Sequence, residues 1–289
     1  MKVSPFTLER YFDKYEFSTP YLLSSSDCEP IRLNELLELS DETTRNKWDN
    51  LKLGYTESKG NPELREEITK LYSTIQSDDV IVLVPEEGIF IAMNVLLERG
   101  DHVITTFPGY QSLYQVASDI GCEISKWTPD QNSNFSIADL KSLITDKTKL
   151  IVINFPHNPT GELISIKAFN EVVQLAREKN VFLFSDEMYR FMEYDEKDRL
   201  PSASDLYENA ISLFGLSKTF GLPGLRIGWL TTKNKKIMSE IVSFKDYTTI
   251  CNNAPGELLG IIALQNKERL IKRSLSIIQN NLGLIKRFA

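Results

Sequence analysis

One glycine-rich segment, residues 215–228, contains both a lysine, Lys218, and an arginine eight positions later, Arg226. Lys218 follows a predicted buried strand, where we expect desolvation to lower the pKa of its amine and free it to form a Schiff base. The Arg226 guanidinium could clamp a phosphate. The glycines let the backbone approach a ligand closely. Pyridoxal phosphate (PLP) is an aldehyde that carries a phosphate and needs a lysine, so these residues predict a PLP site.

Three residues could hold the ring of this cofactor. Asp186 ends a predicted strand, and a buried carboxylate there would keep the pyridine nitrogen protonated, so that the ring acts as an electron sink. Tyr189 and Asn158 could both donate to the ring's phenolic oxygen. Taken singly, Asp186 also fits a helix N-cap, and the run Asn-Pro-Thr-Gly that begins at Asn158 also fits a turn. Their order along one chain favours the cofactor site.

The phosphate and the face of the ring need further partners. The amides of Glu87 and Gly88 lie between a predicted strand and a predicted helix, where a helix N-terminus would attract a phosphate. An ordinary strand-to-helix loop would have the same pattern. Tyr110 follows another strand and could stack on the pyridine ring, although alone it also fits a packing residue. With Arg226 as the fixed positive charge, every part of the site has a candidate.

Motifs of other enzyme classes do not occur in the sequence. It contains no GxxxxGK[ST] loop, no GxGxxG fingerprint and no GxSxG elbow. The two histidines, His102 and His157, are too few for a metal site with carboxylates, so we expect no metal.

Short apolar runs alternate with amphipathic stretches from about residue 60 onward, which predicts an α/β fold with a mostly parallel sheet. Asn158, Asp186 and Lys218 each follow a different predicted strand, so they should meet at the carboxyl edge of the sheet, where such folds bind ligands. The expected strands are 80–84, 102–106, 123–127, 150–154, 181–185, 210–214 and 227–230. The expected helices are 33–39, 88–97, 111–120, 166–179, 236–244, 256–264 and 267–289.

The composition and the net charge limit the kinds of molecule that the protein could bind. The 289 residues carry a net charge of −7, which argues against broad binding to nucleic acid or to an anionic membrane. No signal peptide or membrane-length apolar run is visible. The three cysteines are widely spaced, which indicates free thiols in a reducing compartment. We therefore expect a cytoplasmic protein that binds small molecules.

The motifs around Lys218 resemble those of the fold-type I PLP-dependent enzymes, in the class I/II aminotransferase family. The run from Ser217 to Gly228, SKTFGLPGLRIG, is the most specific of them, and similar segments extend from residue 53 to about residue 265. Residues 154–161 and 245–250 look closest to a branch that includes capreomycidine synthase-like proteins. The resemblance implies a three-layer α/β domain that binds PLP.

The resemblance also implies a role for each candidate residue. Lys218 would form the Schiff base and shuttle a proton, with Asp186 and Tyr189 as the other catalytic groups. Tyr55 would reach the phosphate of a neighbouring subunit, which implies a homodimer. Gly215 stands where many members have a serine. The cofactor-binding set implied by the resemblance is Lys218, Asp186, Tyr189, Asn158, Tyr110, Arg226, Glu87, Gly88, Ser217 and the partner-facing Tyr55.

The expected domains follow from the same resemblance. Residues 1–45 would form an N-terminal arm and part of a small domain, and residues 46–265 the PLP-binding large domain. Residues 266–289 would form a connecting helix at the start of a C-terminal domain that the family continues for roughly a hundred more residues. That domain usually supplies the arginine that binds the substrate's α-carboxylate, so we expect a truncated chain.

The expected reaction is transfer of an amino group between an amino acid and a 2-oxo acid. A PLP-dependent lyase or cyclase of the same fold is the alternative, since the chemistry of the ring is common to these enzymes. A truncated, catalytically inactive chain is a further alternative. The N-terminal segment 22–27 indicates no side-chain preference, so the sequence leaves the substrate open.

Overall fold

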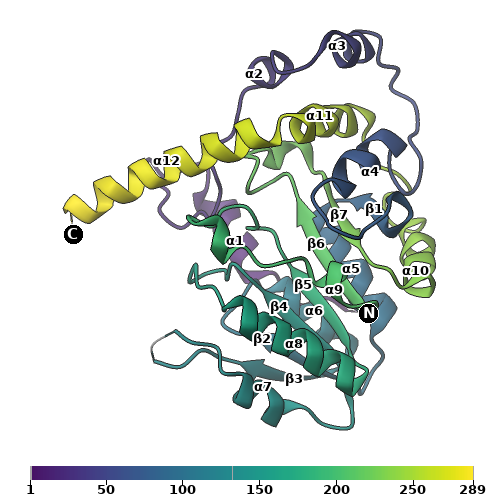
Figure 1. Ribbon diagram of the computed structural model, residues 1–289, viewed down its shortest axis with the longest axis vertical. Helices are drawn as coiled ribbons and strands as arrows, with labels where there is room; N and C mark the ends of the chain where they lie inside the picture. The colour runs from purple at the N-terminus through teal and green to yellow at the C-terminus, as the bar shows by residue number, and fades with distance from the viewer. Residues whose placement is uncertain (1, 132, 289) are drawn as a thin grey trace.

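A single mixed sheet organises the chain, for which a computed structural model describes residues 2–131 and 133–288. The strand order is β1-β7-β6-β5-β4-β2-β3 (Figure 1). The strands are β1 (Val80–Leu83), β2 (His102–Thr106), β3 (Glu123–Trp127), β4 (Thr148–Asn154), β5 (Phe182–Asp186), β6 (Ala210–Gly215) and β7 (Gly228–Thr231). The β2–β3, β2–β4, β4–β5 and β5–β6 pairs are parallel, whereas β7 runs antiparallel to β1 and β6. The predicted α/β class with a mostly parallel sheet is confirmed.

Helices cover both faces of this sheet, which gives three layers (Figure 1). On one face, α5 (Pro85–Leu96), α6 (Ser112–Ile120) and α10 (Lys235–Lys245) enclose one apolar core. On the other face, α7 (Ile137–Leu143), α8 (Ile166–Lys179) and α9 (Ala203–Leu206) pack near β4 and β5. Beside them, α4 (Pro62–Thr69) and α11 (Ala254–Gln265) pack on β1 and β7. Burial from both sides explains the continuous apolar run of β4, whose residues 150–153 have no exposed surface.

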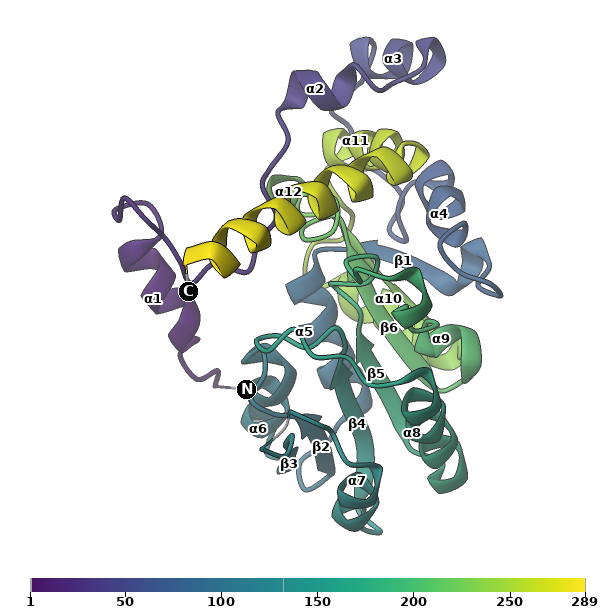
Figure 2. The same ribbon diagram turned by 60° about the vertical axis from the view of Figure 1, so that its left-hand side comes forward.

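The ends of the chain lie outside these layers. The N-terminal region forms α1 (Thr7–Tyr15), α2 (Leu33–Leu37) and α3 (Glu42–Asp49), and the chain's last helix is α12 (Lys267–Phe288). Figure 2 shows α12 extending from α11 away from the sheet. Short 3₁₀ turns occur at η1 (Ser77–Asp79), η2 (Glu196–Asp198) and η3 (Pro223–Leu225). The sequence predicted one helix in this region, 33–39, and missed α1, although Leu8, Tyr11, Phe12 and Tyr15 recur there at helical spacing. None of the side chains of α1 is buried.

The carboxyl end of β6 contacts the start of α5 through two glycines. Gly215 pairs with Gly228 across β6 and β7. A Cβ at Gly228 would lie 2.6 Å from Cγ of Pro85 and 2.8 Å from the carbonyl oxygen of Phe214. Since the missing side chain makes room for Pro85, the first turn of α5 sits directly against the end of the sheet.

Gly228→Ala should therefore destabilise the protein by about 2 kcal/mol, because either the strand pair or Pro85 has to move. Gly224→Ala is the matched control, since a Cβ there meets no atom within 4 Å. We expect the control to stay within about 0.5 kcal/mol of the wild type. Urea unfolding of the three proteins checks this, and equal stabilities of the two variants would contradict the packing argument.

Candidate active site

Polar side chains from separate strands meet at the carboxyl edge of the sheet. Asn154, the last residue of β4, donates from Nδ2 to the backbone carbonyl of Asp186 at 3.0 Å. Its Oδ1 accepts the backbone N–H of Asn158 at 2.7 Å, and Asn158 Nδ2 in turn lies 3.5 Å from the hydroxyl of Tyr189. Asn154 thus joins the loop after β4 to the end of β5, and three of the predicted residues lie together.

The carboxylate of Asp186 is buried at the end of β5, with 5% of the residue exposed. Burial raises its pKa to about 7, and a hydrogen bond from the backbone N–H of Met188 at 3.1 Å only partly offsets this. The neighbouring acids Glu187 and Glu86 raise it further, whereas Lys218 lowers it. A cationic N–H partner, such as a protonated pyridine nitrogen, would favour the ionised form of this carboxylate.

Lys218 forms an ion pair with Asp27, a residue of the N-terminal segment. Burial alone lowers the pKa of its amine, but Tyr189, Asp27 and Asp186 outweigh burial and raise the pKa above its ordinary value. The expectation that desolvation frees the amine is therefore wrong in this structure. The reasons are Tyr189 and then Asp27, which lies 191 positions earlier in the chain and was not among the predicted residues.

Tyr189, one of the two predicted donors to the ring oxygen, also contacts the N-terminal segment. The hydroxyl of Tyr189 donates to Ser26 Oγ at 3.0 Å. Burial raises the pKa of Tyr189, and the nearby amine of Lys218 counteracts this. The tyrosine therefore stands between the amine and the Asn158 loop, where a phenolic oxygen of a ligand could accept hydrogen bonds from both Tyr189 and Asn158.

The first turn of α5 presents backbone N–H groups beside this group of residues. Glu87 and Gly88 lie there as predicted, but the Gly88 N–H already donates to the carbonyl of Val84 at 2.9 Å, and the Glu87 carboxylate accepts from Thr248 and Thr249. Of the two predicted amides, that of Glu87 is therefore the one placed to donate to an anion. Arg226 is exposed and donates to the carbonyl of Pro223 at 3.1 Å. Its charge partly counteracts the burial that raises the pKa of Glu86, the neighbour of Glu87. The guanidinium and the N-terminus of α5 are therefore two positive features in the same part of the site.

Tyr110 packs against Phe6 of the N-terminal region, with ring centroids 5.3 Å apart. Burial raises the pKa of its hydroxyl, and the carboxylates of Glu86 and Glu9 add to the effect. Glu86 accepts a hydrogen bond from Ser112 and is itself largely buried, which raises its pKa. The predicted stacking ring thus lies at the edge of the site, with one face covered by an aromatic residue that was not predicted.

Ser217 provides a test of whether the site suits PLP. Its Oγ is buried, and it has no hydrogen-bond partner among the described residues. Such an orphaned hydroxyl beside Lys218 could donate to an acceptor on a ligand. Together with the buried Asp186 and the amides of α5, it fits a cofactor with a phosphate, a pyridine ring and an aldehyde.

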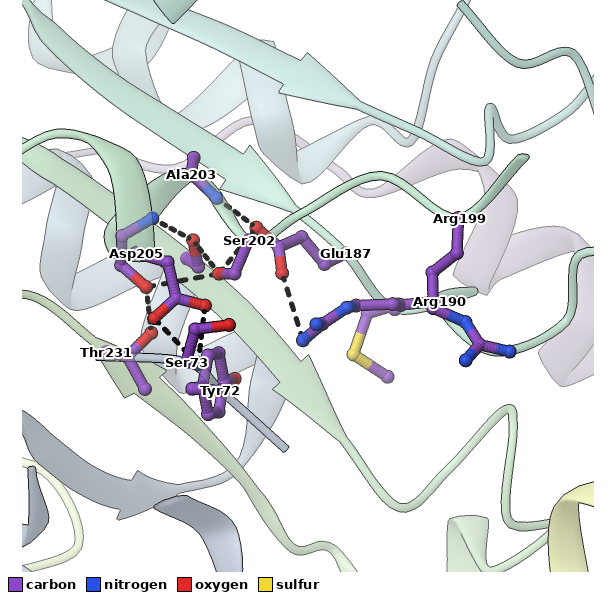
Figure 3. A network of polar contacts seen from close by, with 12 residues as sticks. Tyr72, Ser73, Glu187, Arg190, Arg199, Ser202, Ala203, Asp205 and Thr231 are labelled. Carbon is purple, nitrogen blue, oxygen red and sulfur yellow. Dashed lines mark hydrogen bonds and ion pairs between the residues drawn. The ribbon is translucent and has the colours of Figure 1, made fainter. Parts of the chain in front are cut away.

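A polar network behind β5 holds the Asp186 turn in place (Figure 3). Glu187 is buried and accepts hydrogen bonds from Ser202 Oγ and the backbone N–H of Ala203, both at 3.0 Å. Its other oxygen lies 4.0 Å from Nη1 of Arg190. The carbonyl of Arg190 accepts from Thr219, the neighbour of Lys218, at 2.7 Å. The network therefore links the Asp186 turn to the lysine loop.

The remaining predicted residue, Tyr55, has a different environment. It lies in an irregular segment before α4, and 93% of the residue is exposed. The structure does not bring Tyr55 into the group around Lys218. Within residues 2–131 and 133–288, no cluster of histidine, cysteine or acidic side chains could hold a metal ion, and no helix is long and apolar enough to cross a membrane.

Comparison with known proteins identifies the family. The family model described as aminotransferase class I and II matches residues 38–287, and the chain belongs to this family. Among solved structures, a PLP-dependent aminotransferase from Streptococcus suis 89-1591 superposes with a TM-score of 0.92 at 29% identity, over 99% of this chain and 77% of that one. The predicted family and its fold are thereby confirmed.

Individual relatives have different activities. An aspartate aminotransferase from Sulfolobus acidocaldarius is 33% identical over 65% of this chain and 50% of its own length. A capreomycidine synthase from Streptomyces vinaceus is 29% identical over 68% of this chain and 50% of its own length. The chain thus spans about half the length of these two curated relatives. The PLP-dependent cyclase OrfR superposes with a TM-score of 0.87 at 25% identity, over 99% of this chain and 75% of that one.

The raised pKa of Asp186 predicts how the cofactor-free protein responds to pH. The folded state keeps this proton up to about pH 7, whereas an aspartate ordinarily has a pKa of 3.8, so stability should fall as pH rises between these values. From roughly pH 5.5 to roughly pH 7.5 this group should cost about 2 kcal/mol of the free energy of unfolding. Asp186→Asn should remove that loss, as measured by urea unfolding at both pH values.

Asp146→Asn is the control, because Asp146 is exposed. It should keep the wild-type dependence on pH. If Asp186→Asn kept the same dependence, the buried carboxylate would not titrate in this range.

Proposed function

We propose that the protein is a PLP-dependent aminotransferase that moves an amino group between an amino acid and a 2-oxo acid. One observation carries the proposal: a lysine amine, a buried carboxylate and a tyrosine–asparagine pair converge at the carboxyl edge of the sheet. Family membership and the likeness to a PLP-dependent aminotransferase support the cofactor. PLP is the cofactor that these groups suit.

Each residue has a distinct task in this proposal. When bound, PLP supplies an electron sink for the negative charge that develops at the substrate's Cα. Lys218 would hold the cofactor through Nζ, and its free amine would be the group that moves a proton at the substrate's Cα. Asp186 accepts the pyridine N–H, while Tyr189 and Asn158 donate to the ring oxygen. Arg226, Ser217 and the backbone amide of Glu87 would hold the phosphate, and Tyr110 would cover the ring.

A lyase or cyclase reaction is the second candidate. The residues around the ring could serve either reaction. Two proteins that this chain resembles are named as a capreomycidine synthase and as the PLP-dependent cyclase OrfR. The difference lies in which bond at the substrate is broken after the proton leaves Cα. This choice depends on groups around the substrate rather than on Lys218 or Asp186.

We further propose a homodimer in which Tyr55 reaches the phosphate of the partner subunit. Tyr55 is exposed and lies away from the group around Lys218 in its own subunit, as a residue that contacts a second subunit should. We also propose the cytoplasm as its location, because Cys28, Cys122 and Cys251 are free thiols.

Adding PLP should produce a visible absorption band in the wild type and none in Lys218→Ala. Borohydride reduction followed by peptide mass spectrometry should place the pyridoxyl group on Lys218. Lys245→Ala is a control, since this lysine is buried but donates to the carbonyls of Ser58 and Ile250, away from Asp186. Labelling of another lysine, or no band in the wild type, would refute the assignment.

The two reactions differ in what remains on the protein after one turnover. A transaminase should convert bound PLP to its pyridoxamine form when an amino acid is added without a 2-oxo acid. A lyase or cyclase should return the PLP form. The cofactor released by acid can be separated and quantified, and recovery of PLP alone together with an altered amino acid would favour the second candidate.

A further inference from the structure

The site opens into a cavity of about 300 Å³ whose walls come from distant parts of the chain. Ser26, Asp27 and Cys28 of the N-terminal segment form one wall, and the loop around Asn158 forms another. Tyr189 and Ile278 of α12 complete the enclosure. Since Tyr189 and Asn158 are proposed to bind the ring, this cavity is the space beside the cofactor where the substrate would lie.

The charge of the cavity comes from one carboxylate. Among the described residues that line it, the acids are Asp27 and Glu193, and none is an arginine or a lysine. Glu193 is neutralised by Arg199, whose Nε lies 3.3 Å from its carboxylate. Asp27 has Lys218 as its ion-pair partner and a hydrogen bond from Ser25 Oγ at 3.0 Å. Within the part of the chain that the structure describes, the ion-pair partner of Asp27 is thus the reactive lysine.

Attachment of the cofactor removes that cation. The Lys218 nitrogen forms a C=N bond with the aldehyde carbon, and water leaves. It then no longer offers Asp27 a free ammonium. The Asp27 side chain is 36% exposed and lines the cavity, so its carboxylate can pair with another cation there. The cofactor's own phosphate is an anion and cannot take this place.

From this exchange of partners we infer that Asp27 selects amino acids whose side chain carries an amine or a guanidinium. The inference rests on the proposed function. A substrate's α-amino group must be unprotonated to react with the aldehyde, so the cation that persists is on the side chain. A second carboxylate on the substrate, as in aspartate or glutamate, would meet Asp27 with like charge.

The same pairing would help the chemistry. The amine that leaves the cofactor must be neutral to take the proton from Cα, and Asp27 stabilises its protonated form. A substrate cation that occupies Asp27 keeps the carboxylate from recapturing Lys218. Binding of the correct side chain would therefore also favour the basic form of the lysine.

The test uses amino acids of similar length that differ at the end of the side chain: L-ornithine, L-arginine, L-norvaline and L-glutamate. The second-order rate constant for each is measured from the absorbance of PLP-loaded protein in a single turnover. Ornithine or arginine should react roughly tenfold faster than norvaline, and glutamate should react more slowly than norvaline. If norvaline or glutamate reacts as fast as both cationic amino acids, the inference is wrong.

Variants show whether Asp27 selects the substrate or only maintains the fold. Asp27→Asn should lower the preference for the cationic side chain over norvaline, taken as the ratio of the two rate constants in the same variant, by roughly tenfold. Its Kd for PLP, from absorbance titration, should be no weaker than that of the wild type, because a competitor for Lys218 has been removed. Glu29→Gln, an exposed neighbour outside the cavity, should behave as the wild type. An unchanged preference in Asp27→Asn would overturn the role of Asp27.

The outcomes also distinguish this inference from the proposed function. PLP binding with faster reaction of glutamate would leave the aminotransferase proposal standing and refute the selection by Asp27. Absence of PLP binding by the wild type would refute both.

Discussion

The structure of the site depends on keeping a carboxylate buried at the end of a β-strand. Asp186 lies where β5 leaves the sheet, and its pKa near 7 shows that the fold holds it against the cost of desolvation. Two sets of contacts hold it there. Asn154 binds its carbonyl from the neighbouring strand, and Glu187 anchors the following turn to Ser202 and Ala203. A cationic ring nitrogen is the partner that this arrangement lacks.

The parallel arrangement of the strands accounts for the position of the other site residues. Residues that follow β4, β5 and β6 are brought to one edge by the order of the sheet, and α5 adds its N-terminus through the close packing of Pro85 on Gly228. Because these elements are rigid and buried, the site is largely preformed. The N-terminal segment differs, since Asp27 and Ser26 reach the site from a region of irregular structure.

Much of this could be predicted from the sequence, because local patterns specify it. The strands with β-branched runs, the helix 166–179 and the positions of Asn158, Asp186 and Lys218 after strands follow from periodicity and order. The antiparallel direction of β7 has no local signal. The Lys218–Asp27 pair joins residues 191 positions apart. Nothing in the sequence around Glu187 distinguished it from an acid with no role in the site. Such contacts depend on how distant segments fold together, so neither the raised pKa of Lys218 nor the charge of the cavity was visible beforehand.

A crystal structure of the PLP-loaded protein tests the central claim most directly. The account predicts that the cofactor is joined to Lys218 Nζ, that the Asp186 carboxylate accepts a hydrogen bond from the pyridine nitrogen, and that Asp27 no longer contacts the lysine. Cofactor bound at another lysine, or a pyridine nitrogen without a contact to Asp186, would contradict it.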